Sequence, residues 1–231
     1  MIDFHSHILP SFDDGSKNVE ESCALLKMLS AQGVKKALLT PHFYADNESV
    51  DEFLKRRSES YAALKESLTE DMPEVLLGAE VKFYQGISRL ENLKALCVNE
   101  SNLLLLEMPF CKWTEYTVKE VLDIASNGEL TVVLVHIERY FKFFNKGVLE
   151  KLLNNGVLMQ ANADFFVNAF TRKKALKMLF NQSIQLIGSD CHNLTTRPPR
   201  INEAFYRIEK KYGKGFVEYI NDYGNNLFSN R

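Results

Sequence analysis

The sequence predicts an α/β protein with a parallel sheet, on the basis of two observations. Short apolar runs of strand length, rich in Leu, Val and Ile, alternate with longer stretches of helical period. No linker, internal repeat or low-complexity tract divides the chain, so we expect a single domain spanning residues 1–231. Periodicity leaves open whether the strands form a doubly wound sheet or a barrel. The expected strands, each buried on both faces, are residues 2–4, 36–39, 75–77, 103–106, 131–135, 157–159 and 184–187.

The stretches between these strands are expected to be helices, because their apolar residues recur every three or four positions. Three of them end at a glycine, Gly33, Gly128 or Gly156, and glycine readily adopts the left-handed backbone that terminates a helix. Residues 49–69 are more charged and predict an exposed helix, and the chain from Arg200 onward is expected to form a helical cap. The apolar helix faces are Val19, Ser22, Leu26 and Leu29; Val118, Val121, Leu122 and Ala125; Val148, Leu149, Leu152 and Leu153; and Ala175, Leu176, Leu179 and Phe180.

Composition and charge exclude several classes of protein. With 45% hydrophobic and 25% charged residues, the chain has the composition of a globular protein rather than a disordered or fibrous one. The 28 Lys and Arg residues nearly balance the 30 Asp and Glu residues, which argues against a nucleic-acid partner bound through a broad basic face. No secretory signal and no apolar run of bilayer length is visible, so we expect a cytoplasmic protein without membrane insertion.

All five histidines follow an expected strand, together with four acidic residues. Functional groups in parallel α/β folds gather at the carboxyl ends of strands, so we expect these side chains to share one site. His5 and His7 are two residues apart on a strand, so they point to the same side and can chelate one ion. Asp190 and His192 have the same spacing, which leaves Cys191 pointing away from them. The candidate metal ligands are His5, His7, Asp14, His42, Glu80, Glu107, His136, Asp190 and His192.

Each candidate has an ordinary structural explanation when it is taken alone. A single His or Glu is commonly a core or surface residue, and Asp14 in the Asp-Asp-Gly run would be a turn residue. The joint pattern is what favours a metal centre, because it uses every histidine in the chain. Imidazole and carboxylate ligands without thiolate suit Mn, Fe, Co or Zn, and a carboxylate such as Glu80 can bridge two ions.

Six motifs surround these candidates, in order along nearly the whole chain. They are His-Ser-His-Ile-Leu-Pro-x-x-Asp-Asp-Gly at 5–15, Thr-Pro-His at 40–42, Gly-Ala-Glu at 78–80, Glu107, His-Ile-Glu-Arg-Tyr at 136–140 and Ser-Asp-Cys-His-Asn at 189–193. Together they resemble the PHP (polymerase and histidinol phosphatase) superfamily. Within it, the chain is most similar to the bacterial capsule and exopolysaccharide tyrosine-protein phosphatases.

The resemblance implies a fold, a set of metal sites and two phosphate-binding arginines. The implied fold is a distorted (β/α)7 TIM-like barrel, and the implied cofactor is Mn2+, with up to three divalent ions. Arg139 and Arg197 would bind the substrate phosphate. The implied ligands are His5, His7, Glu80 and Asp190 for the first ion; Glu80, Glu107 and His136 for the second; and Asp14, His42 and His192 for the third.

The function implied by the resemblance is phosphomonoester hydrolysis by attack of a metal-bound hydroxide on phosphorus. The ligand set holds four carboxylates, so three divalent ions would change its charge from −4 to +2 and make it attractive to phosphate. The implied substrate is a phosphotyrosine protein, namely a membrane-bound tyrosine autokinase of capsule or exopolysaccharide synthesis. Aromatic residues near the motifs could flank such a substrate or simply cover the core: Tyr44, Phe110, Trp113 and Tyr116.

Four other functions remain open at this point. A related enzyme could act on a small phosphate such as histidinol phosphate, or as a nuclease, although the neutral charge disfavours the latter. A non-catalytic metal-binding or kinase-docking protein is the alternative outside enzymes. Cys191 and Arg197 are also spaced as in cysteine-dependent phosphatases. However, no glycine lies between them, and Pro198 and Pro199 have no N–H for phosphate, so we expect free, non-catalytic cysteines.

Overall fold

The strands form two parallel sheets, and the chain passes directly from one sheet to the other at two places. The computed structural model describes residues 1–99 and 101–228, and the expected domain boundary at residue 231 lies outside them. The first sheet has the order β1-β2-β4 and the second has the order β3-β5-β6-β7-β8-β9. The described strands are β1 (Ile2–Ser6), β2 (Lys36–Leu39), β3 (His42–Phe43), β4 (Glu74–Leu77), β5 (Glu80–Lys82), β6 (Leu103–Glu107), β7 (Thr131–Leu134), β8 (Leu158–Asn162) and β9 (Leu186–Gly188).

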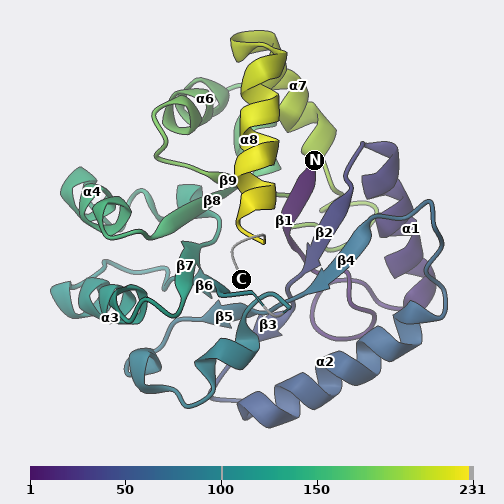
Figure 1. The fold of residues 1–231 in the computed structure, drawn as a ribbon, viewed down its shortest axis with the longest axis horizontal. Helices are drawn as coiled ribbons and strands as arrows, with labels where there is room; N and C mark the ends of the chain where they lie inside the picture. The colour runs from purple at the N-terminus through teal and green to yellow at the C-terminus, as the bar shows by residue number, and fades with distance from the viewer. Residues whose placement is uncertain (100, 229–231) are drawn as a thin grey trace.

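The two sheets together close into a distorted barrel (Figure 1). The chain passes from β2 to β3 and from β4 to β5 within two or three residues, so each pair occupies one position around the ring. The last strand returns to the first: the His7 N–H donates to the Cys191 carbonyl at 2.9 Å, and the Asp190 N–H donates to the His5 carbonyl at 2.8 Å. This confirms the barrel and decides against an open doubly wound sheet.

Two features of the strands differ from the sequence prediction. The strands β3 and β5 were not expected, since each has only two or three residues and shows no periodicity. The run 75–77 was expected to be buried on both faces, but Val75 and Leu77 are partly exposed. The reason is that β4 pairs with β2 alone within its sheet, so it lies at an edge.

Helices form between the strands, as the helical periodicity predicted, and most of them lie around the ring, whereas the C-terminal helix lies across one end of it (Figure 1). Gly33, Gly128 and Gly156 each have a positive φ just after a helix, as expected. The charged stretch 49–69 contains a helix that begins at a capping box formed by Ser49 and Glu52. The described helices are α1 (Val19–Ala31), α2 (Val50–Lys65), α3 (Glu115–Ser126), α4 (Lys146–Asn154), α5 (Ala163–Val167), α6 (Arg172–Phe180), α7 (Ile201–Tyr212) and α8 (Lys214–Asn226), with 3-10 turns η1 (Ile87–Arg89), η2 (Leu93–Leu96) and η3 (Ile137–Tyr140).

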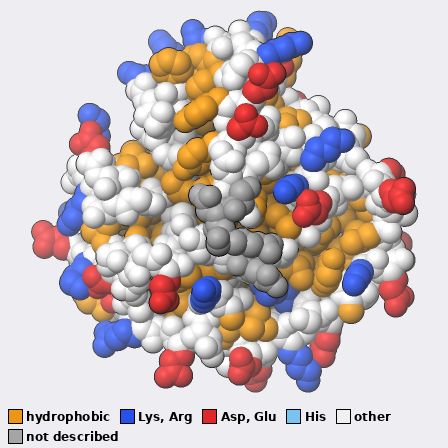
Figure 2. Space-filling model, viewed as in Figure 1, with side chains coloured by type: hydrophobic (Ala, Val, Ile, Leu, Met, Phe, Trp, Pro, Cys, Tyr) orange, Lys and Arg blue, Asp and Glu red, His pale blue; other side chains and the backbone are white. Residues whose placement is uncertain are grey.

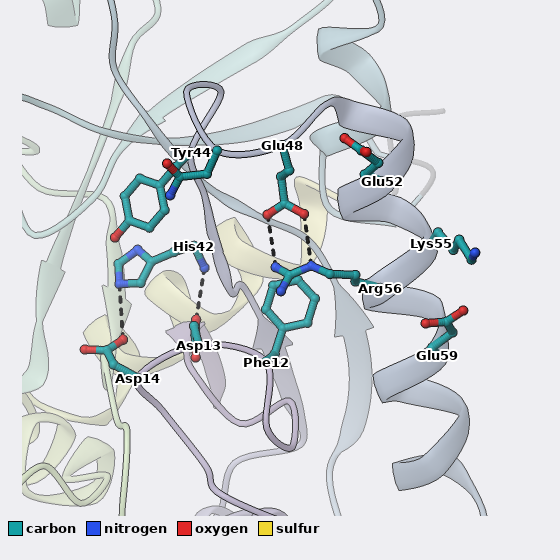
Figure 3. A pocket seen from close by; sticks show the side chains of 11 residues that line it. Phe12, Asp13, Asp14, His42, Tyr44, Glu48, Glu52, Lys55, Arg56 and Glu59 are labelled. Atoms are coloured by element: carbon teal, nitrogen blue, oxygen red, sulfur yellow. Dashed lines mark hydrogen bonds and ion pairs between the residues drawn. The ribbon is translucent and has the colours of Figure 1, made fainter.

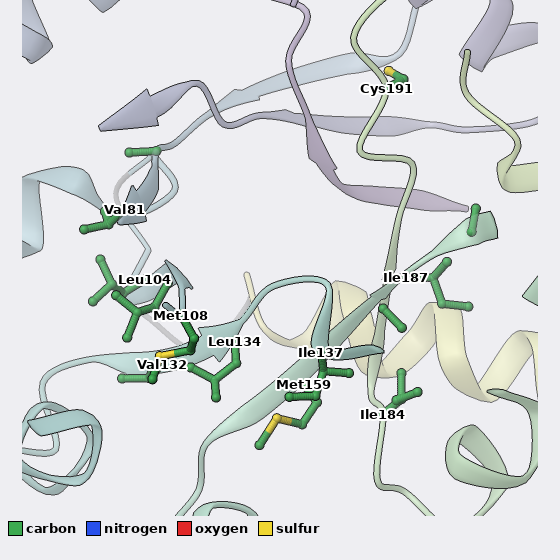
Figure 4. Close-up of a cluster of buried hydrophobic side chains, with 14 of the residues drawn as sticks. Val81, Leu104, Met108, Val132, Leu134, Ile137, Met159, Ile184, Ile187 and Cys191 are labelled. Carbon is green, nitrogen blue, oxygen red and sulfur yellow. The ribbon is translucent and has the colours of Figure 1, made fainter. Parts of the chain in front are cut away.

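Buried apolar side chains form two clusters, one on each face of the strands. The larger cluster lies between the strands and the surrounding helices, and Figure 4 shows part of it. The smaller cluster takes residues such as Phe4, Leu105 and Val133 from strands on opposite sides of the ring, so it fills the barrel interior. Tyr223 and Leu227 at the end of α8 pack against this inner cluster. The interior is therefore solid at one end, which leaves the other end for polar groups.

The molecular surface carries charges of both signs. On the face shown in Figure 2, Lys and Arg side chains are intermixed with Asp and Glu side chains. None of the described helices is long and apolar enough to cross a membrane.

Candidate metal centre

The structure brings all nine candidate metal ligands together at the carboxyl ends of the strands. His5 is the penultimate residue of β1, and His7 directly follows the strand. His42 and Glu80 begin the short strands β3 and β5, and Glu107 ends β6. The remaining candidates, His136, Asp190, His192 and Asp14, lie in the segments that follow β7, β9 and β1. Most are buried, whereas the Asp14 side chain is 64% exposed at the rim.

Glu80 is the centre of this cluster. Its Oε2 atom lies 3.3 Å from His5 Nε2 and 3.2 Å from His7 Nε2. The same oxygen lies 3.0 Å from His42 Nδ1, and the other carboxylate oxygen lies 2.8 Å from His136 Nε2. A single buried carboxylate thus faces four imidazoles, which is the arrangement expected of a bridging ligand.

Asp190 completes a group with the two histidines of the first motif. Its Oδ1 atom lies 3.9 Å from His5 Nε2 and 3.7 Å from His7 Nε2. The two imidazole Nε2 atoms are themselves 3.1 Å apart, as expected for side chains that point to the same side of β1. His5, His7 and Asp190 therefore form a group with the spacing of metal ligands.

The other candidate groups lie beside this one. Asp14 Oδ1 is 3.4 Å from His42 Nε2 and 3.4 Å from His192 Nε2, and these three residues group with His7. Glu107 Oε1 is 3.7 Å from His136 Nε2. Glu107 also groups with Glu80 and His42, so the clusters share members rather than standing apart.

The donor spacing fits divalent cations. Two ligand atoms that each lie about 2.1 Å from one ion are roughly 3.0 to 3.4 Å apart in octahedral or tetrahedral geometry. The distances from Glu80 Oε2 to three imidazole nitrogens are 3.0, 3.2 and 3.3 Å. Among the described residues, neither Glu80 Oε2 nor His42 Nδ1 has a partner with proper hydrogen-bond geometry, although both atoms are buried. A cation would satisfy these atoms, because buried polar groups without partners are costly.

Charge in the cluster is divided between buried carboxylates and buried imidazoles. Burial raises the pKa of Glu80, but the imidazoles around it, His5 foremost, hold that pKa well below its ordinary value. Burial lowers the pKa of His5 and His7, yet the neighbouring carboxylates raise both above the ordinary value. Burial and the charge of His7 lower the pKa of His192 to about 4. Metal binding to these imidazoles therefore competes with protons, because a ligating histidine must be neutral.

Two of the candidate ligands have unusual backbone conformations. His136 has φ 34° and Asp190 has φ 53°, in the left-handed region that non-glycine residues seldom adopt. The expectation of an extended backbone through residues 190–192 is therefore wrong at Asp190, although Asp190 and His192 do lie in one cluster. Cys191 is fully buried in the outer core, as expected, and burial raises the pKa of its thiol.

Asp13 is a functional candidate that the sequence analysis passed over. Its carboxylate accepts a hydrogen bond from His7 Nδ1 at 2.8 Å and from the His42 N–H at 3.0 Å. This contact fixes the orientation of His7 and directs its Nε2 atom toward Glu80. Gly15 allows the loop to fold this closely, because a Cβ atom there would lie 2.1 Å from the His7 carbonyl oxygen. In the sequence, the Asp-Asp-Gly run at 13–15 was the signal that could have identified Asp13.

Gln160 and Asn162, on β8, form a second set of supporting side chains. The Gln160 Oε1 atom accepts from the His136 N–H at 2.7 Å and lies 3.4 Å from His5 Nδ1. Asn162 donates from Nδ2 to Asp190 Oδ2 at 2.8 Å, and Gln160 donates to Asn162 at 3.1 Å. These amides connect three candidate ligands from different strands.

The two predicted phosphate-binding arginines lie at the edge of the cluster. Arg197 lies 2.8 Å from Asp190 Oδ1, and Arg139 donates to the other oxygen of the same carboxylate. Both side chains are just over one-third exposed, so their guanidinium groups can reach a ligand. Asn193 holds the loop in front of Arg197 by accepting hydrogen bonds from several of its backbone N–H groups.

A cavity of about 460 Å3 opens above the cluster. Six candidate ligands and both arginines line it, together with an apolar wall that includes Met108, Pro109 and Phe110. Of the four aromatic residues considered from the sequence, Tyr44 and Phe110 line this cavity. Trp113 is instead buried against Tyr140, and Tyr116 is exposed outside the cavity lining.

A larger groove of about 850 Å3 adjoins this cavity (Figure 3). Asp14, His42 and Tyr44 line both, so the two spaces meet at the candidate third-ion group. Helix α2 forms the far wall, and Glu48, just before this helix, accepts two hydrogen bonds from Arg56 at 2.9 and 3.0 Å.

Comparison with known proteins identifies the class to which this fold and site belong. The family model for capsular polysaccharide synthesis proteins CpsB/CapC matches residues 1–226. The chain therefore belongs to the CpsB/CapC family, which confirms the resemblance inferred from the motifs.

Individual relatives agree with this assignment. The tyrosine-protein phosphatase CpsB of Streptococcus pneumoniae is 32% identical over 232 residues, covering 92% of this chain and 91% of the relative. The tyrosine-protein phosphatase YwqE of Bacillus subtilis (strain 168) is 28% identical over 219 residues, covering 92% and 85%. A chain from the crystal structures of YwqE and CpsB, described as unique metal-dependent tyrosine phosphatases, superposes with a TM-score of 0.84. At 24% identity over all of this chain and 95% of that one, this match supports the fold.

Proposed function

We propose that this protein is a metal-dependent protein-tyrosine phosphatase. The observation that carries it is the clustering of nine candidate metal ligands around Glu80, with six of them and two arginines lining one cavity. Membership of the CpsB/CapC family supports it, as do relatives that are tyrosine-protein phosphatases.

The proposed cofactor is Mn2+, with up to three divalent ions; Fe, Co or Zn fit the same donors. His5, His7, Glu80 and Asp190 would hold the first ion, and Glu80, Glu107 and His136 the second. Asp14, His42 and His192 would hold the third. When bound, the ions supply positive charge for phosphate oxygens and lower the pKa of water for hydrolysis.

Arg139 and Arg197 would bind the phosphate at the edge of this cluster. Their planar guanidinium groups can donate two hydrogen bonds each, which suits the oxygens of a phosphate group. Arg139 donates a hydrogen bond to Asp190 and Arg197 forms an ion pair with it, and both arginines line the cavity. A nucleophilic cysteine is not needed in this scheme, and the buried Cys191 thiol lies outside the cavity lining.

The proposed physiological substrate is a phosphotyrosine on a membrane-bound tyrosine autokinase of capsule or exopolysaccharide synthesis. Named relatives are tyrosine-protein phosphatases, and the matching family model is one of capsular polysaccharide synthesis. The proposed location is the cytoplasm, because a kinase that uses ATP is phosphorylated there.

Metal analysis combined with a substrate panel tests this proposal. The purified protein should contain divalent metal, lose activity on chelation and regain it with Mn2+. A phosphotyrosyl peptide should be hydrolysed faster than a phosphoseryl peptide or histidinol phosphate. Preference for histidinol phosphate would instead identify a small-metabolite phosphatase.

An arginine variant separates catalysis from metal binding. Arg139→Ala should lower kcat/KM by about 100- to 1,000-fold, as for loss of one oxyanion donor, while metal content stays unchanged. Arg89→Ala, which removes an exposed arginine in η1, is the matched control. If wild type and Arg139→Ala bind metal and are equally inactive on every phosphate, the protein is a non-catalytic binding protein and the proposal is wrong.

A further inference from the structure

Phe110 is a half-exposed aromatic residue at the wall of the cavity. Its side chain is 54% exposed, although the protein buries most of its large apolar residues. The Phe110 ring stacks on His136, with centroids 6.3 Å apart and planes 14° apart, and it lies 5.2 Å from the Tyr140 ring. It is therefore supported by these rings while more than half of its surface remains available to a ligand.

The segment that carries Phe110 is held rigidly from below. The hydroxyl of the fully buried Tyr140 accepts a hydrogen bond from the Met108 N–H at 3.1 Å. Trp113 packs 5.4 Å from the Tyr140 ring and donates from Nε1 to the Pro109 carbonyl at 3.2 Å. The Trp113 N–H also donates to the Phe143 carbonyl at 3.0 Å. Because the backbone is anchored before and after Phe110, its ring is positioned before any ligand arrives, which reduces the entropy cost of binding.

A second aromatic ring lines the same cavity. Tyr44 stacks on His42 with centroids 5.2 Å apart, and Lys82 Nζ lies 4.9 Å from the Tyr44 ring. Both aromatic residues are thus backed by an imidazole of the cluster and adjoin the place where a phosphate would lie.

We propose that Phe110 determines specificity for aryl phosphates by packing against the tyrosyl ring of the substrate. This inference rests on the proposed phosphatase function. A phosphotyrosyl group whose phosphate reaches the cluster must pass its ring along the cavity wall, where it can cover the exposed part of Phe110. A phosphoseryl group has no ring to make this contact. Aromatic pairing of this kind changes binding about 2- to 10-fold.

The test compares Phe110→Ala with wild type on one peptide sequence carrying either phosphotyrosine or phosphoserine, in the presence of Mn2+. Phe110→Ala should raise KM for the phosphotyrosyl peptide about 2- to 10-fold and leave kcat/KM for the phosphoseryl peptide unchanged. The inhibition constant of inorganic phosphate, which has no ring, should also stay unchanged. Phe110→Trp should restore the low KM, and Phe110→Leu should not.

Tyr116→Ala is the matched control, since Tyr116 is exposed nearby in sequence but lies outside the cavity lining. It should behave as wild type. If Phe110→Ala weakens phosphate inhibition and slows both peptides equally, Phe110 merely supports His136 and the inference is overturned. If it leaves phosphotyrosyl KM unchanged, the inference is also overturned while the proposed function stands. Wild-type protein that hydrolyses no phosphotyrosyl peptide would overturn both.

Discussion

Replacement of Asp13 by Asn tests whether this carboxylate positions His7 for metal binding. Asp13 Oδ2 accepts hydrogen bonds from both His7 Nδ1 and the His42 N–H, and Oδ1 accepts one from the Gly15 N–H at 3.0 Å. An amide has only one acceptor oxygen, so Asp13→Asn must lose at least one of these bonds. It also loses the negative charge that makes His7 a stronger base.

The expected magnitude follows from these contacts. Loss of a carboxylate that orients a ligating histidine typically weakens metal binding or activity by about 10- to 100-fold. One hydrogen bond to a charged group contributes about 1.5 to 3 kcal/mol, so a loss of roughly that size in the free energy of unfolding is also expected. Calorimetry on chelator-treated protein measures the Kd for Mn2+ and checks the loss of metal affinity. Urea unfolding measures the free energy of unfolding and checks the loss of stability.

Asp51→Asn is the control for this experiment, because it makes the same charge change at an exposed position in the first turn of α2. Its Kd for Mn2+ should equal that of wild type. If Asp13→Asn binds Mn2+ as tightly as wild type does, Asp13 does not position His7 for the ion and the reasoning fails.

Three further predictions concern the thiol, the metal and the pH dependence of stability. Cys191→Ser should keep activity within about two-fold, since a buried, protonated thiol is no nucleophile; a variant that binds metal but is inactive would contradict this. Mn2+ at 100 times its Kd should stabilise the fold by about 2.7 kcal/mol, or roughly 5–11 °C in Tm, and a chelator should remove this gain. If neither Mn2+ nor the chelator changed the Tm, the protein would not bind Mn2+ in its folded state. Burial raises the pKa of Glu120, but hydrogen bonds led by the Ser88 N–H, 3.2 Å away, bring it below the ordinary value of 4.5. The charge of Glu120 therefore stabilises the fold above pH 4.5, and this stabilisation disappears as the pH falls through the lowered pKa. Glu120→Gln should be less stable than wild type at neutral pH but equal to it in acid. Urea unfolding at both pH values would refute this if the difference in the free energy of unfolding were constant.

The sequence predicted the positions of the strands where apolar runs were long enough to be distinctive. It could not predict β3 and β5, because Pro41 and Gly78 interrupt the apolar runs of β2 and β4. The strand segments that follow are too short to show a periodic pattern of apolar residues. Periodicity also could not separate a barrel from an open sheet, and only the resemblance of the motifs implied a barrel. That distinction depends on the contact between His7 and Cys191, which are far apart in sequence.

The candidate ligands were predictable because parallel strands end at the same edge, so residues after each strand must lie together. The residues that support these ligands were not predictable from the sequence. Asp13 sits in a run that also predicts a turn, and either aspartate could have been the ligand. Gln160 and Asn162 extend β8 beyond the apolar run that predicted it, and their partners come from other strands.

The proposed metal ligation across the joint between β1 and β9 would affect when the protein becomes functional during synthesis. His5 and His7 emerge from the ribosome first, whereas Asp190 and His192 emerge after most of the chain. The cluster cannot be complete until β9 lies beside β1, because both halves contribute to the same group. Activity therefore reports a finished and closed barrel, and a chain terminated before β9 would be released without a functional centre.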